Sequence, residues 1–113
     1  MVAILTRNVN ILIMSKRLRP VHPGEVLLED FLKPYGISPY RLAKTIGVAP
    51  IQISEIIRAK RAISAKTALL LARSFGTSPQ FWIRLQAQYD LEVTEPEIHD
   101  RLAKVPSLVA LAA

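Results

Sequence analysis

Apolar residues recur at helical spacing in five stretches between positions 23 and 90, and proline, glycine or serine bounds each stretch. In the first, Leu28, Phe31 and Leu32 have the i, i+3, i+4 spacing of one buried helix face. After Met14 no convincing run alternates apolar and polar residues as a half-buried strand does. The pattern therefore predicts an all-α chain with helices over residues 23–33, 39–46, 50–58, 65–75 and 79–90.

Local signals mark the ends of these helices, and one apolar face of each is expected to form the core. Proline suits a first helical position, serine an N-cap and glycine a left-handed C-terminal residue. These signals are Pro23, Pro39, Pro50 and Pro79; Ser38, Ser64 and Ser78; and Gly36, Gly47 and Gly76, with Pro34 also ending the first helix. The later inner faces are Leu42, Ala43 and Ile46; Ile53, Ile56 and Ile57; Ala68, Leu69, Ala72 and Phe75; and Phe81, Trp82, Leu85 and Tyr89.

A sixth, weaker helix is predicted over residues 95–105. Thr94 and Glu97 have the spacing of a capping box, and Pro106 would end the helix. Ile98, Leu102 and Val105 would share one face. The last residues, SLVALAA, are expected to form a frayed terminus, with an apolar interface strip as the alternative.

The second and third predicted helices are separated by a three-residue turn, residues 47–49, as in a helix-turn-helix motif. Ala43 is small enough for the two helices to approach closely, and Gly47, four residues later, suits a turn that needs positive φ. Ile53 and Ile56 would face inward. In such a motif the second helix lies in the major groove of DNA. The alternative is an ordinary helical hairpin.

Composition favours the first interpretation. The chain has 113 residues, enough for one domain, and a net charge of +6. Residues 1–90 carry 13 basic and 5 acidic side chains, whereas residues 91–113 carry 2 basic and 4 acidic ones. Such a basic balance indicates a polyanionic partner, either nucleic acid or an anionic membrane surface.

The position of the basic residues decides between these partners. A group of cations lies on or just after the predicted helix-turn-helix, where they would contact phosphates without reading base sequence. They are Arg41, Lys44, Arg58, Lys60 and Arg61. This clustering favours DNA over a membrane; a solvated charge run is the alternative.

Several classes of function are not supported. The absence of cysteine excludes disulfide scaffolds, cysteine nucleophiles and thiolate zinc sites. His22, beside Glu25, is expected to cap or pack, and His99, beside Asp100, to be solvated. No triad order, phosphate loop or acidic metal cluster occurs. We therefore expect no enzyme activity, catalytic residue, metal, cofactor or small-molecule substrate.

The first 14 residues are apolar but interrupted by Arg7, Asn8 and Asn10, so they fit neither a signal peptide nor a membrane span. Two interpretations stay open: a flexible or partner-bound arm, or an over-called extension before a native start at Met14. Either way, a cytoplasmic protein is expected.

Three motifs, in order, resemble a known family. They are HPGEVLLEDFL at 22–32, SPYRLAKTIGV at 38–48 and RAKRAISAKTALLLARSFGTSPQFWIRLQAQYDLE at 58–92. Together they are similar to HigA-type antitoxins, within the Cro/C1-type helix-turn-helix group. The resemblance covers about residues 19–91. It implies a five-helix, lambda-repressor-like DNA-binding domain, a homodimer that represses its own operon, and a RelE-type (HigB-like) mRNA interferase toxin as partner.

At Pro50, Ile51, Gln52 and Glu55 the outer face of the predicted recognition helix departs from the Ser, Thr or Arg common in that family. It consists of Pro50, Ile51, Gln52, Ser54 and Glu55. Gln52 could bond adenine, Ile51 a thymine methyl and Glu55 cytosine N4. The alternative is that Gln52 and Glu55 are merely solvated.

Operators with two half-sites require a two-fold dimer. Its candidate interface residues are Phe81, Leu85, Tyr89, Ile98 and Leu102, although Trp82 is expected in the core. The expected organisation is an N-terminal arm over 1–18, the DNA-binding domain over 19–91, and a C-terminal helix and tail over 92–113. Alternative functions are a stand-alone Cro/C1-type repressor without a toxin, and an interaction module that no longer touches DNA.

Overall fold

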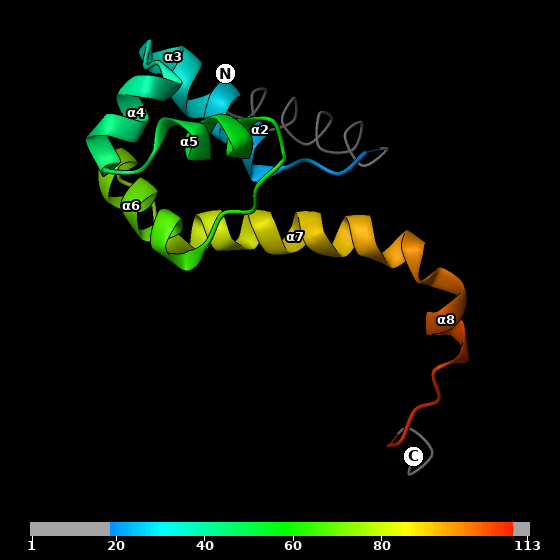
Figure 1. Cartoon of the computed structure of the whole chain (residues 1–113). Helices are drawn as coiled ribbons and strands as arrows, with labels where there is room; N and C mark the ends of the chain where they lie inside the picture. Colours follow the sequence, from blue (N-terminus) through cyan, green and yellow to red (C-terminus); the bar gives the residue numbers. More distant parts are fainter. Residues whose placement is uncertain (1–18, 110–113) are drawn as a thin grey trace, which may run out of the picture.

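A computed structural model describes residues 19–109 of the chain, and the described residues form helices without strands (Figure 1). The elements are α2 (Pro23–Val26), the π-helical η1 (Leu27–Leu32), α3 (Lys33–Tyr35), α4 (Pro39–Ile46), α5 (Pro50–Ile57), α6 (Ala65–Phe75), α7 (Pro79–Glu97) and α8 (His99–Lys104). The predicted all-α class is therefore confirmed. The arm predicted over residues 1–18 and the last four residues lie outside the described range.

The first predicted helix is longer than expected, because α2, η1 and α3 run on without a break from Pro23 to Tyr35. The prediction that Pro34 ends it is wrong. Pro34 follows a π-helical stretch in which the Lys33 N–H bonds Leu28 O, five residues back. The wider turn accommodates the proline. Gly36, with φ 64°, is the residue that ends the helix.

The middle of the chain follows the predicted boundaries closely. Both α4 and α6 begin and end as expected, with Ser38 and Ser64 as N-caps and Gly47 and Gly76 as left-handed C-caps. In α5, the last helical residue is Ile57, and Arg58 is the C-cap rather than part of the helix.

Eleven buried apolar side chains form one core between these helices. Trp82 is fully buried, as predicted, and its indole N–H donates to Thr77 Oγ1 at 2.8 Å. The predicted inner face of α6 is wrong at Leu69, which is 60% exposed, while Leu71 is buried. The core residues are Leu27, Leu32, Leu42, Ala43, Ile46, Ile53, Ile56, Ile63, Ala68, Leu71 and Trp82.

The C-terminal part differs most from prediction. α7 continues to Glu97 instead of ending near Asp90, so Thr94 and Glu97 lie inside one helix and form no capping box. No glycine or proline stands between Asp90 and Pro96 to end the helix. Pro96 lacks the N–H for the next turn, and the helix ends one residue later. α8 is correspondingly shorter than predicted.

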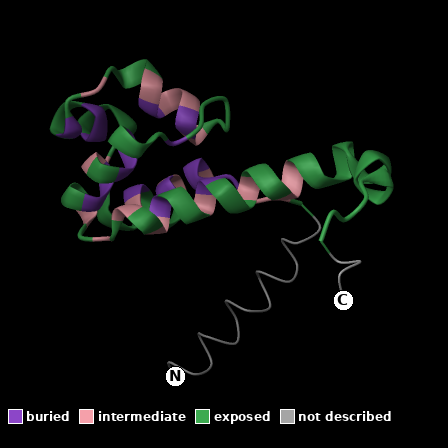
Figure 2. Cartoon of the chain, turned by 90° about the horizontal axis from the view of Figure 1, so that it is seen from below, coloured by how far each residue is buried: buried purple, intermediate pink, exposed green. Residues whose placement is uncertain are grey.

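The far half of α7 and α8 extends away from the other helices (Figure 1). Buried and half-buried residues gather where α2–α6 meet the first half of α7, whereas the far end of α7 and α8 are almost wholly exposed (Figure 2). We call residues 91–109 the C-terminal segment and residues 19–90 the body. α7 runs continuously from the body into the segment, across the predicted boundary at residue 91.

Candidate nucleic-acid interface

α4 and α5 pack as the two helices of a helix-turn-helix. Ala43 is fully buried, and its carbonyl accepts from the N–H groups of Gly47 (2.9 Å) and Val48 (3.0 Å). Gly47 has φ 76°, so it ends α4 in the left-handed conformation that glycine adopts without steric cost. Ile53 and Ile56 hold α5 on the core. The turn geometry inferred from Ala43 and Gly47 is thus present.

The predicted reading face of α5 divides into two kinds of residue. Pro50 is exposed, and Ile51 is 55% exposed on the first turn. Gln52 and Glu55 are half-buried and engaged within the chain. Gln52 Nε2 donates to Thr67 Oγ1 at 3.2 Å, and Glu55 pairs with Arg61. The half-buried Ser54 contributes its backbone oxygen, which lies 3.4 Å from Arg58 Nε.

The five predicted phosphate contacts are all exposed. Arg61 Nε and Nη2 both approach Glu55 Oε1, at 2.8 and 2.6 Å. This pair ties the α5–α6 loop (residues 58–64) to the helix before it. Lys44 Nζ lies 5.8 Å from the centre of the Tyr40 ring. Arg41 and Lys44 stand on α4, the helix packed beside α5, whereas the other three cations stand in the loop.

The loop has a fixed backbone. Ala59 adopts φ 60°, a conformation that costs a residue with a side chain about 1–2 kcal/mol. Its N–H bonds Ile56 O at 3.0 Å, and the Lys60 N–H bonds Glu55 O at 2.8 Å. At the far end Ile63 is buried, and its N–H donates to Gln86 Oε1 at 2.8 Å.

The candidate dimer residues also divide. Phe81 packs against Phe31 and Trp82, and Leu85 packs against the core. Tyr89 meets the ring of His22 edge-on at 4.7 Å. In contrast, most large apolar side chains of the C-terminal segment are exposed in this chain; Ile98 is 37% and Leu102 45% exposed.

His22 has the capping role expected of it. It is buried, and its Nδ1 accepts from the Gly24 N–H at 2.9 Å. Burial lowers the pKa of His22 below its ordinary value, an effect that the charge of Asp90 partly opposes. The unprotonated ring is therefore the form that caps α2.

Two important residues were missed from the sequence. A Cβ on Gly24 would lie 1.8 Å from Ile56 O, so α2 meets the end of α5 at a distance that only glycine permits. A glycine just inside a helix is unfavourable without such a reason, and that was an available signal. Gln86 is buried on α7, and nothing local to it indicates that its partner lies 23 residues earlier.

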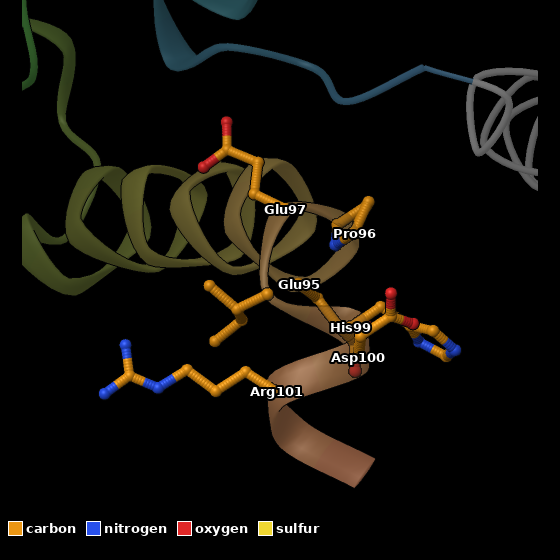
Figure 3. Close-up of a pocket in the computed structure, with 7 residues that line it drawn as sticks. Glu95, Pro96, Glu97, His99, Asp100 and Arg101 are labelled. Atoms are coloured by element: carbon orange, nitrogen blue, oxygen red, sulfur yellow. The ribbon is translucent and has the colours of Figure 1, made fainter. Parts of the chain in front are cut away.

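A hollow of about 960 Å³ lies where α7 meets α8, lined by residues 95–101 (Figure 3). Its lining side chains are all exposed. Among residues 19–109, no three His, Cys, Asp or Glu side chains are grouped so as to hold a metal ion. Within the same range, no helix is long and apolar enough to cross a membrane.

Comparison with known proteins agrees with this geometry. The helix-turn-helix family profile matches residues 28–82. Virulence-associated protein I of Dichelobacter nodosus is 48% identical over 77 residues, which cover 68% of this chain and 71% of that protein. Antitoxin HigA-1 of Vibrio cholerae is 38% identical over 73 residues, covering 65% and 69%.

A solved structure extends the similarity to most of the described chain. It is antitoxin HigA of Pseudomonas aeruginosa with the higBA promoter, which superimposes with a TM-score of 0.76 at 38% identity and covers 80% of this chain and 99% of that one. With the paired α4 and α5, the buried Ala43 and the left-handed Gly47, these matches identify the chain as a member of the HigA-type antitoxin family, within the Cro/C1-type helix-turn-helix group.

Proposed function

We propose that this protein is a dimeric, operator-binding autorepressor and the antitoxin of a type II toxin–antitoxin module. The observation that carries the DNA-binding part is the α4–α5 geometry with exposed cations on either side of α5. α5 would enter the major groove, and its outer face would meet base edges. The P. aeruginosa relative, with its promoter, is similar over the same helices.

Phosphates would be held by the exposed cations on α4 and in the α5–α6 loop. Arg61 remains suited to this role despite its ion pair, because a guanidinium has five N–H donors and Glu55 engages two of its nitrogens. The ion pair therefore orients Arg61 and leaves N–H donors of its guanidinium available for a phosphate. Glu55 Oε2 is left to accept from cytosine N4. The proposed phosphate contacts are Arg41, Lys44, Arg58, Lys60 and Arg61.

Base readout would rest mainly on the first turn of α5. Ile51 is exposed there and apolar, which suits contact with a thymine methyl group. Gln52 Nε2 has two hydrogens, so one can donate to Thr67 while the other, together with Oε1, bonds an adenine. Pro50 and Ser54 would complete the surface that fits the groove.

Two-fold operators require a dimer, and the C-terminal segment offers an exposed apolar surface for it. Ile98 and Leu102 would form its centre, since both are exposed in the single chain. Phe81, Leu85 and Tyr89 contribute at most their outer edges, because they also pack within their own chain.

The toxin is expected to be a small basic, RelE-like mRNA interferase, as membership of the HigA-type family implies. We propose that a folded surface of the antitoxin meets it, because helix continues through Lys104 in the free chain. The alternative, a stand-alone repressor, differs in one observable: no small basic protein would co-purify stoichiometrically from native cells.

DNA binding is tested by titrating the protein against its own promoter at several salt concentrations. Arg58→Ala/Arg61→Ala should lose about tenfold or more in affinity, and its plot of log affinity against log salt should be shallower by about two phosphate contacts. Arg101→Ala/Lys104→Ala is a matched control, since it removes the same charge from the C-terminal segment. An interaction module that no longer touches DNA predicts equal behaviour of all three proteins.

A further inference from the structure

Gln86 is a buried amide whose hydrogen bonds link two distant parts of the chain. It is 7% exposed, and the core around it is apolar. Its Oε1 accepts from the Ile63 N–H at 2.8 Å, and its Nε2 donates to Asp90 Oδ1 at 2.9 Å. A buried amide without partners is costly, so these two bonds fix the side chain in one orientation.

Ile63 lies at the end of the α5–α6 loop, the segment that carries the proposed phosphate-binding cations. In Figure 1 this loop leaves α5 and comes down to α7 before α6 begins. Its first half is held to α5 by the bond from Lys60 N–H to Glu55 O and by the Arg61–Glu55 ion pair. Its second half is held by the burial of Ile63 and by Gln86.

The loop is therefore attached at both ends, once to α5 and once to α7. Lys60 and Arg61 stand between the two attachments, and both are exposed. A phosphate contact requires its donor at a distance of about 3 Å, so a shift of the loop by an ångström weakens such a contact.

We propose that Gln86 is a positioning residue for DNA binding, which sets where the α5–α6 loop presents Lys60 and Arg61 to the phosphate backbone. It acts through Ile63 and does not itself touch DNA. Because Gln86 stands on the helix that continues into the C-terminal segment, it also connects that segment to the DNA-binding loop. The proposal rests on the proposed function of the loop cations.

The first test is Gln86→Leu, which replaces the amide with an apolar side chain of similar volume and so removes both hydrogen bonds. Affinity for the promoter should fall about tenfold, and the log–log salt slope should become shallower by about one, as for the loss of a phosphate contact. Thr77→Val is the matched control: it deletes the acceptor of another, partly buried side-chain hydrogen bond, the one from the Trp82 indole N–H. It should lower the denaturation midpoint but leave the salt slope unchanged.

A second pair of variants separates positioning from general stability. Gln86→Glu keeps an acceptor for the Ile63 N–H but loses the donor to Asp90. Gln86→Glu/Asp90→Asn restores that bond in the reverse direction at unchanged net charge. The double variant should recover the promoter affinity and salt slope to within about threefold of the parent. If Gln86→Leu does not fold, the comparison of Gln86→Glu with the double variant tests the proposal instead.

The proposal is overturned if folded Gln86→Leu keeps the parent's slope and affinity. It is equally overturned if Thr77→Val loses as much of both, or if the double variant does not recover them. Failure of the proposed function has a different signature, because Arg58→Ala/Arg61→Ala would then bind the promoter as the parent does.

Discussion

The body of this protein fully or partly buries most of its large apolar residues, whereas the C-terminal segment leaves most of its own exposed. In the body, the apolar faces of the helices meet in one core, and ten basic side chains outnumber five acidic ones on the outside. In the C-terminal segment, large apolar side chains stay exposed and four acidic residues outnumber two basic ones. The body therefore has its own core and a basic surface suited to a polyanion. The segment carries apolar surface typical of an interface with another protein.

The largest loss of stability in the body is expected at Gly24, where α2 contacts the end of α5. Gly24→Ala places a Cβ against the Ile56 carbonyl and should destabilise the body by about 3 kcal/mol, at the upper end of overpacking effects. Urea denaturation measures this change. Gly36→Ala is the control, because no atom lies near its Cβ and only the positive φ is costly, about 1–2 kcal/mol. Equal effects at both positions would show that α2 and α5 do not depend on this close contact.

The next largest effect is expected from substitutions in the C-terminal segment. Ile98→Asp/Leu102→Asp should convert the proposed dimer into a monomer and weaken promoter binding about a hundredfold, because two half-sites are no longer bound together. The unfolding free energy of the body should stay nearly unchanged in the monomer. Sedimentation and denaturation measure the two effects. Leu69→Asp alters a more exposed leucine on α6 and should leave the oligomeric state as it is. A dimer that survives the segment variant would place the interface elsewhere.

The smallest effect concerns His22, at the junction of α2 and α7. Its folded pKa is lowered by burial, so its contribution is complete above the ordinary histidine pKa of about 6.5 and is lost as pH falls through the folded value. Loss of this cap is worth about 1 kcal/mol. His22→Asn keeps a capping oxygen and should remove this part of the pH dependence of unfolding below about pH 6.5. The same dependence in both proteins would assign it to other groups.

The same contrast explains how far the sequence was predictive. The bounds of α4 and α6 were predicted correctly because Ser38, Gly47, Ser64 and Gly76 act within one turn of their own helix. The exposed face of α6 was not, because residues 68–72 are all apolar and Leu69 was assigned to the inner face, although the i, i+3, i+4, i+7 spacing of residues 68, 71, 72 and 75 favours Leu71. The Thr94–Glu97 pattern misled because it is equally compatible with a helix interior.

The candidate site was predicted only where its features depend on residues close together in the sequence. Ala43, Gly47 and the loop cations follow a local spacing and were found. The bonds from Gln52 to Thr67 and from Gln86 to Ile63 join residues 15 and 23 positions apart, and only the packed fold brings them together. Gln52 and Glu55 are half-buried and each bonds another side chain of the protein, and their contact with bases stays a prediction.

The cations beside α5 are proposed to bind a phosphate backbone, and the salt dependence of promoter binding is the most direct test of this role. For the parent, log affinity should fall linearly against log salt, with a slope of about −0.9 for each phosphate contacted. Arg58→Ala/Arg61→Ala should reduce that slope by about two contacts, and Arg101→Ala/Lys104→Ala should not. The contrary result is a weak affinity that is the same for promoter and unrelated DNA, with equal slopes in all three proteins. It would show that these cations do not bind the phosphate backbone of the promoter.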